Sequence, residues 1–82
     1  MIWLMTFEST YAALAAQKTF ESLEYAFTAM TRPADIEAGC GIALRFEAES
    51  SAAALALANK ACVAKGFCAL YEQSSEGYLL VS

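Results

Sequence analysis

The segment Arg32–Gly41 separates two halves of this chain that follow the same pattern. It contains the single proline, two of the four glycines and several charged residues. Because proline fixes φ and lacks an N–H donor, neither a helix nor a central strand is expected to run through this segment. On each side of it, a bulky apolar stretch is followed by an alanine-rich stretch and then by another apolar stretch. The chain is therefore expected to form two strand–helix–strand units joined by this loop.

The first half predicts a strand, a helix and a second strand. Ile2–Phe7 is bulky and partly β-branched, which is typical of a strand buried on both faces. Ser9 or Thr10 can cap a helix over Tyr11–Leu23, where apolar residues recur at steps of three and four. Tyr25–Met30 alternates loosely and precedes the proline, so it is expected to be an edge strand.

The second half repeats this order and adds one strand. Ile42–Glu47 alternates between apolar and other residues, as a strand with one buried face does. Serines precede the alanine-rich segment Ala52–Lys65, which predicts a helix closed by Gly66 in a left-handed conformation. Phe67–Glu72 and Tyr78–Val81 flank a turn-rich segment and predict a carboxyl-terminal hairpin.

These elements favour an α+β fold of the ferredoxin-like type, a split βαβ sandwich forming a single domain over residues 1–82. Phe7-Glu8 followed by an alanine-rich stretch matches Phe46-Glu47 followed by another, which supports a duplicated plan. We expect an antiparallel sheet with two helices on one face. We also expect the first and third strands to be parallel at its centre, and the Arg32–Gly41 loop to lie beside the carboxyl ends of both helices.

The composition argues against several classes of function. A net charge of -4 disfavours nucleic acid as a partner. No window reaches the roughly 20 apolar residues of a membrane span, and the short apolar amino terminus does not resemble a signal peptide, so we expect a cytoplasmic protein with no membrane partner. The absence of histidine excludes Cys-His and Ser-His catalysis, and neither a metal nor another cofactor is expected.

Cys40 is the one candidate nucleophile. Gly39 and Gly41 flank it, so the backbone is free to adopt unusual conformations and the thiol is expected to be presented to a second macromolecule. Its reactive form is the thiolate, and the nearest cations in the sequence are Arg32 and Arg45. Two carboxylates in the same loop oppose ionisation. The alternative reading is a tight turn in which Cys40 fills space.

The other two cysteines carry no recognisable pattern. Three cysteines are an odd number, and their spacing fits neither a disulfide framework nor a zinc site, so reduced thiols are expected. Cys62 shares a helical face with Leu55, and Cys68 follows Phe67 in a strand. Both are expected to be small buried hydrophobic residues. A disulfide between either of them and Cys40 is the alternative.

The order of motifs resembles a known family. Thr6–Thr10 followed by Ala12–Leu14, the loop with Pro33, and above all Cys40–Phe46 resemble the selenium/sulfur carrier protein-like family of small bacterial domains. The resemblance implies a carrier, not a true enzyme. Cys40 would hold sulfur or selenium as a persulfide-like adduct received from a protein donor such as a cysteine desulfurase. Arg45, the family's strand arginine, and Arg32 would stabilise that adduct.

Two other functions remain open at this point. The chain could be a ferredoxin-like interaction module in which Cys40 is incidental, pairing as a homodimer through its sheet or through the apolar strand Tyr78–Val81. It could also be a redox sensor that cycles Cys40 through a sulfenic acid.

Overall fold

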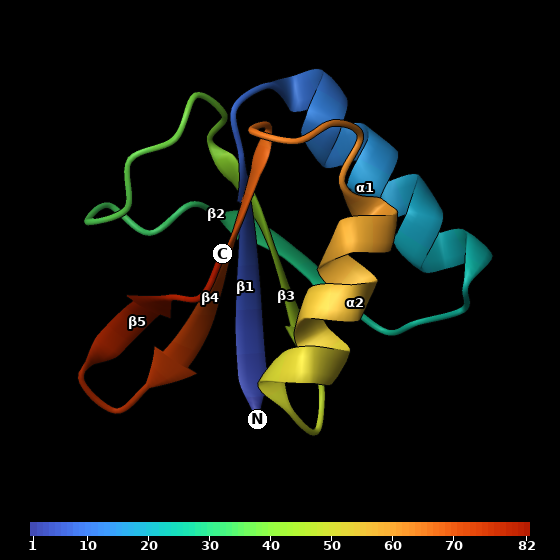
Figure 1. The fold of residues 1–82 in the computed structure, drawn as a ribbon. Coiled ribbons are helices and arrows are strands. Elements are labelled where there is room, and N and C mark those ends of the chain that lie inside the picture. Colours follow the sequence, from blue (N-terminus) through green and yellow to red (C-terminus); the bar gives the residue numbers. More distant parts are fainter.

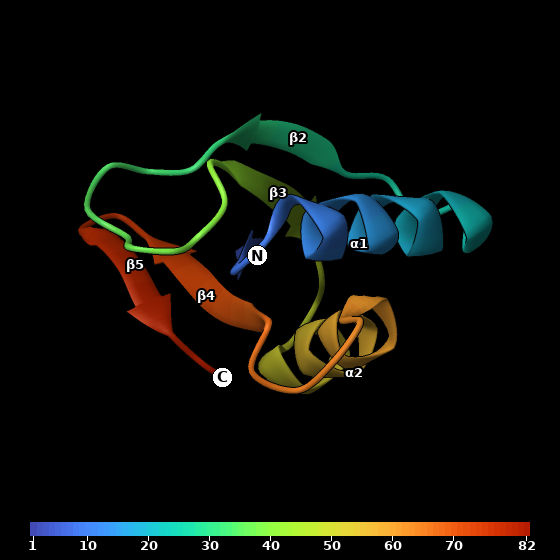
Figure 2. The ribbon, with the colours of Figure 1, turned by 90° about the horizontal axis from the view of Figure 1, so that it is seen from above.

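One antiparallel sheet and two helices make up the fold in the computed structural model, which describes residues 1–82. The strands lie in the order β2-β3-β1-β4-β5 (Figure 1). Both helices cover the same face of the sheet (Figure 2). The predicted α+β, ferredoxin-like arrangement is therefore confirmed. The elements are β1 (Ile2–Phe7), α1 (Thr10–Ser22), β2 (Thr28–Thr31), β3 (Ile42–Glu47), α2 (Ser51–Ala61), β4 (Cys68–Ser74) and β5 (Gly77–Leu80).

The central pair of strands runs opposite to our expectation. We predicted that the first and third strands are parallel, but β1 and β3 are antiparallel, with Leu4 opposite Arg45. The reason is that the βαβ crossover makes β1 parallel to β2 and leaves a gap between them. β3 follows β2 antiparallel and fills this gap, with Ala29 opposite Leu44.

Helix α1 is closed at both ends by local interactions. Ser9 is the N-cap, and its hydroxyl accepts a hydrogen bond from the Ala12 N–H. At the other end, Glu24 has a φ of 54° and the Tyr25 N–H donates to the Phe20 carbonyl, which forms a Schellman motif. This motif holds Tyr25 against Phe20, with ring centroids 5.9 Å apart. The second strand therefore begins at Thr28, three residues later than predicted.

Helix α2 is shorter than predicted. It begins after the Ser50 cap but ends at Ala61, because Cys62 already has an extended backbone with ψ 127°. Gly66 is left-handed, with φ +88°, as predicted, but it is not the helix cap. It is the third residue of a turn in which the Phe67 N–H donates to the Ala64 carbonyl. Neither helix is long and apolar enough to cross a membrane.

The predicted carboxyl-terminal hairpin is confirmed. β4 and β5 pair in antiparallel fashion from Tyr71 opposite Leu80 to Ser74 opposite Gly77, leaving a two-residue turn. Gly77 has φ +136°, a conformation that favours glycine. β5 and β2 are the two edges of the sheet.

Alternate residues of the central strands face two different environments. The helix-facing side forms a core of 16 buried residues that includes Trp3, Met5, Phe7 and Phe20. Four aromatic rings, from Phe20, Tyr25, Phe27 and Phe46, meet edge to face at one end of this core. The other side has a small cluster of Leu4, Ala43 and Ile36, in which Ile36 comes from the β2–β3 loop.

Candidate functional site

The Arg32–Gly41 loop lies at the end of the sheet where α1 begins. The Cys40 N–H donates to the Phe7 carbonyl at the end of β1, and α1 starts at Thr10. We predicted that the loop lies beside the carboxyl ends of both helices, and this is wrong for α1. The same strand reversal explains the difference: β1 points toward this end of the sheet, so the helix that follows it must start here. Figure 2 shows the loop (green) extending away from the helix layer before it returns to β3.

Cys40 is buried, with only 3% of its surface exposed. The expectation of a thiol presented to solvent is therefore wrong for this conformation. Cys40 is in phase with Ile42, Leu44 and Phe46, so it faces the helices as they do and belongs to the same core cluster. Its backbone bond to Phe7 holds the end of the loop against the end of β1, just before β3 begins. The alternation that defines β3 extends two residues into the loop, and it could have predicted this orientation.

Two polar groups lie within hydrogen-bond range of the Cys40 sulfur. The Ile42 N–H donates to Sγ at 3.4 Å, and the Thr10 hydroxyl lies 3.7 Å from Sγ. Thr10 is the first residue of α1, and the first turn of this helix contains no acidic residue. The amino end of a helix carries a partial positive charge, which favours an anion nearby. The Cys40 sulfur therefore accepts one hydrogen bond from the Ile42 N–H, and it shares a second with the Thr10 hydroxyl, in which either group can donate.

The two glycines beside Cys40 have different surroundings. A Cβ on Gly39 would lie 2.1 Å from the Glu8 carbonyl oxygen, so the loop can cross the β1–α1 junction here only with glycine. A Cβ on Gly41 would meet nothing within 4 Å. Gly39 therefore seats the loop against the start of α1, whereas Gly41 is not required by packing.

Arg32 holds the loop together. Its backbone N–H donates to the Gly41 carbonyl at 2.8 Å and closes the base of the loop. Its guanidinium donates to the carbonyls of Ile36 and Pro33, while its Nε is buried without a hydrogen-bond partner. The structure therefore shows Arg32 bonded to loop carbonyls and does not show it bonded to the Cys40 sulfur.

Arg45 is not brought near Cys40. It is exposed and shares the open side of the sheet with Ala43, whereas Cys40 faces the helices. Five residues along an extended strand also separate the two by about 16 Å. Arg45 lines a shallow hollow with Glu24, Thr28 and Glu47 at the other end of β3.

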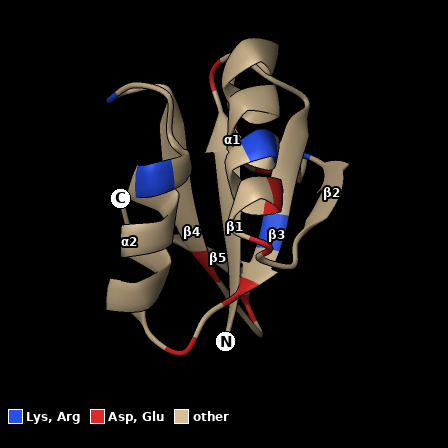
Figure 3. Ribbon diagram, turned by 90° about the vertical axis from the view of Figure 1, so that its right-hand side faces the viewer, with Lys and Arg blue, Asp and Glu red and all other residues tan.

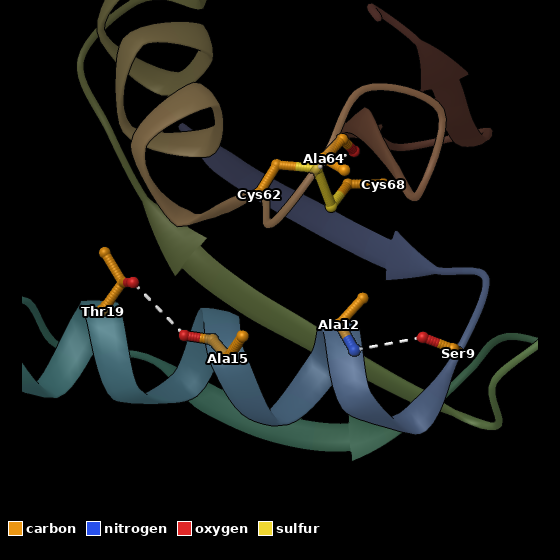
Figure 4. Close-up of a disulfide and its surroundings, with 7 residues drawn as sticks. All are labelled: Ser9, Ala12, Ala15, Thr19, Cys62, Ala64 and Cys68. Carbon is orange, nitrogen blue, oxygen red and sulfur yellow. Dashed lines mark hydrogen bonds between the residues drawn. A yellow bond between two sulfur atoms is a disulfide. The ribbon is translucent and has the colours of Figure 1, made fainter.

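Cys62 and Cys68 form a disulfide, with their Cα atoms 6.0 Å apart. Figure 4 shows the sulfur–sulfur bond between the end of α2 and the start of β4. Our expectation of two separate reduced thiols is corrected by this bond, and Cys40 is left as the free cysteine. Sequence spacing did not indicate the pair because α2 was predicted to run through Cys62. A helix that ends at Ala61 turns this side chain back toward β4.

Comparison with known proteins identifies the family. No curated protein and no solved structure matches the chain significantly. The family described as "Putative Se/S carrier protein-like" matches residues 3–67, which contain all of β1 except Ile2, both helices, the loop and Cys40. Because this match covers most of the chain, the protein belongs to the Se/S carrier protein-like family.

Proposed function

We propose that this protein carries sulfane sulfur or selenium on Cys40 as a persulfide-like adduct and delivers it to a partner enzyme. The observation that carries the proposal is the placement of the free Cys40 sulfur at the amino end of α1, with the Ile42 N–H and the Thr10 hydroxyl beside it. In the loading step, the Cys40 thiolate attacks the outer sulfur of a persulfide on a donor such as a cysteine desulfurase. The donor's own sulfur leaves as its thiolate, so no other reductant is needed.

Loading requires the Arg32–Gly41 loop to open, because only 3% of Cys40 is exposed in the closed loop. Opening breaks the Cys40–Phe7 backbone bond and the Arg32–Gly41 backbone bond and lifts Ile36 from the open face of the sheet. These are few interactions, and Gly39 and Gly41 provide flexible positions on both sides of the sulfur. A closed loop would also protect the adduct from solvent during transport.

The two arginines have separate proposed roles. The unpartnered Arg32 Nε is a donor that an anionic adduct could use once the loop moves. Arg45 is exposed on the open side of the sheet, where it can contact an acidic surface of the donor or acceptor. The chain has no role in this scheme beyond carrying and protecting the adduct, so it acts as a carrier and not as an enzyme. We place the exchange in the cytoplasm.

Cys40→Ser should abolish sulfur loading, because the hydroxyl cannot hold a persulfide. The measurement is intact-protein mass spectrometry after incubation with a cysteine desulfurase and free cysteine. The parent protein should gain one sulfur atom per chain, and this gain should be reversed by dithiothreitol.

The matched control is the double variant Cys62→Ser/Cys68→Ser, which keeps Cys40 and removes the other sulfurs. It should load as the parent does. If Cys40→Ser gains sulfur as readily as the parent, the Cys40 carrier role is wrong.

A second function, self-association as an interaction module, is favoured by the edge of the sheet. β5 is an edge strand, and its residues Leu79 and Leu80 are 60% and 66% exposed. An exposed apolar edge strand with unpaired backbone groups is suited to pair with a second copy of itself. We propose that two chains pair along β5 into a homodimer.

Light scattering coupled to size-exclusion chromatography tests this pairing. We expect the parent to approach the mass of two chains as its concentration rises, and Leu80→Lys to remain a monomer because a lysine on the edge opposes strand pairing. Leu14→Lys, at a half-exposed site on α1, should behave as the parent does. A parent that remains monomeric at every concentration would exclude the homodimer.

A further inference from the structure

The Cys62–Cys68 disulfide lies where a second molecule can reach it. Both cysteines are partly exposed and sit on the wall of a surface hollow of about 400 Å³. The same hollow is lined by apolar side chains, including Leu55 and Leu70. A buried structural disulfide would lack this access. We propose that Cys62 and Cys68 form a thiol–disulfide exchange site that takes two electrons from a dithiol.

The charge around this disulfide suits the approach of a thiolate. Lys65, in the connection between the two cysteines, has the only charged side chain among the residues that line the hollow, and the last residue, Ser82, lines it as well. Lys60 is in the last turn of α2 close by in the sequence. Figure 3 shows these two cations on α2 and on the connection that follows it. The attacking species in disulfide exchange is an anion, so a positive charge here attracts it although the whole chain carries a net charge of -4.

The fold can hold the reduced pair as well as the oxidised pair. The Cys62 sulfur lies 3.1 Å from the Ala64 carbonyl oxygen. A disulfide sulfur has no hydrogen to donate, but after reduction the two sulfurs separate and the Cys62 thiol can donate to this oxygen. β4 is also attached to β1 independently of the disulfide, because the Glu8 N–H donates to the Phe67 carbonyl and Phe7 pairs with Cys68.

The exchange balances without any further reactant. One thiolate of the dithiol attacks a sulfur of the pair and forms a mixed disulfide, while the other cysteine leaves as a thiolate and takes up a proton. The second thiol of the dithiol then displaces the first cysteine. The dithiol is oxidised to a disulfide, and Cys62 and Cys68 are reduced to thiols by two electrons and two protons. Cys40 takes no part, so the site does not depend on the proposed carrier function.

The test is a native redox titration of the full chain in glutathione buffers of increasing reducing strength. The thiols are alkylated at each point, and peptide mass spectrometry identifies the labelled cysteines. We expect Cys62 and Cys68 to become labelled together in one transition, with unchanged circular dichroism and with Cys40 still protected. The proposal is overturned if the pair stays oxidised at every ratio that leaves the chain folded. It is also overturned if the pair is already labelled in excess oxidised glutathione.

A second arm measures the rate of reduction by dithiothreitol. Lys65→Glu should slow the reaction by about threefold to tenfold, since it reverses the charge that attracts the thiolate. Lys65→Arg should keep the rate of the parent. An unchanged rate in Lys65→Glu would contradict an exchange site that draws its partner through this cation.

Discussion

Gly39→Ala should expose Cys40 while the rest of the chain stays folded. The added Cβ would lie 2.1 Å from the Glu8 carbonyl oxygen, which is far inside van der Waals contact, and a backbone group cannot move aside as a flexible side chain does. Forcing one methyl group into such a site typically costs about 1–3 kcal/mol. That cost falls on the closed loop and not on the open loop. Each 1.4 kcal/mol is a factor of ten in an equilibrium, so the open population should rise by roughly 5- to 140-fold.

The measurement is the rate at which a thiol reagent labels Cys40 in native buffer. Cys40 is 3% exposed and is the free cysteine of the oxidised chain, so labelling reports loop opening directly. Gly41→Ala is the matched control, because its Cβ would meet nothing within 4 Å. It should change the labelling rate by less than about twofold, as a surface substitution worth under ~0.5 kcal/mol does. Equal rates in the two variants would show that Gly39 does not hold the loop closed.

Phe20→Ala should lower the free energy of unfolding by about 3–5 kcal/mol, which is the usual cost of removing a buried aromatic ring. Phe20 is fully buried, and its ring meets those of Tyr25, Phe27 and Phe46 edge to face at 5.2–5.9 Å. It is also the residue that the Schellman motif joins to Tyr25 at the end of α1. One substitution therefore removes the centre of the aromatic cluster, while the backbone bond between Tyr25 and Phe20 remains.

Chemical denaturation followed by circular dichroism measures this loss of free energy. In thermal unfolding, the same loss corresponds to a fall in melting temperature of about 15–30 °C for a domain of this size. Leu14→Ala on the same helix is the matched control, because Leu14 is half exposed, and it should cost far less. A Phe20→Ala variant as stable as Leu14→Ala would show that the cluster does not anchor the fold. Phe20→Ala also separates global from local opening, since it should expose Cys40 only through unfolding of the whole domain.

The elements of the fold followed from local chemistry. The strand Ile42–Glu47 and the strand Ile2–Phe7 were predicted with their observed bounds, because each is a bulky apolar or alternating run with clear ends. Hydroxyl residues marked the helix starts because a short hydroxyl side chain satisfies the free N–H groups there, and of the candidates at each start the structure uses Ser9 and Ser50. The bounds of β2, β4 and β5 differ from the predicted ones by one to three residues, and the end of α2 differs by four. Glu24 adopts the left-handed conformation at the end of α1, and no local signal marked this.

The candidate site was only partly predictable. Cys40 was recognised as the candidate nucleophile, and it is the free cysteine, but its exposure was predicted wrongly because the flanking glycines suggested an open turn. The Cys62–Cys68 disulfide and the distance between Arg45 and Cys40 both depend on where strands end and which side of the sheet they face. Such facts join residues far apart in the chain, and sequence spacing does not report them.

The sequence by itself determined the order of strands and helices and the single loop between the two halves, because hydrophobic period, caps and breakers act over a few residues. The family followed from the resemblance of the Cys40–Phe46 segment. Only the tertiary structure decided that β1 and β3 are antiparallel, that α1 begins beside the loop, and that Cys40 is enclosed. These outcomes come from long-range strand pairing. Pairing sets the direction of each strand and therefore which helix end, and which partial charge, the Cys40 sulfur meets.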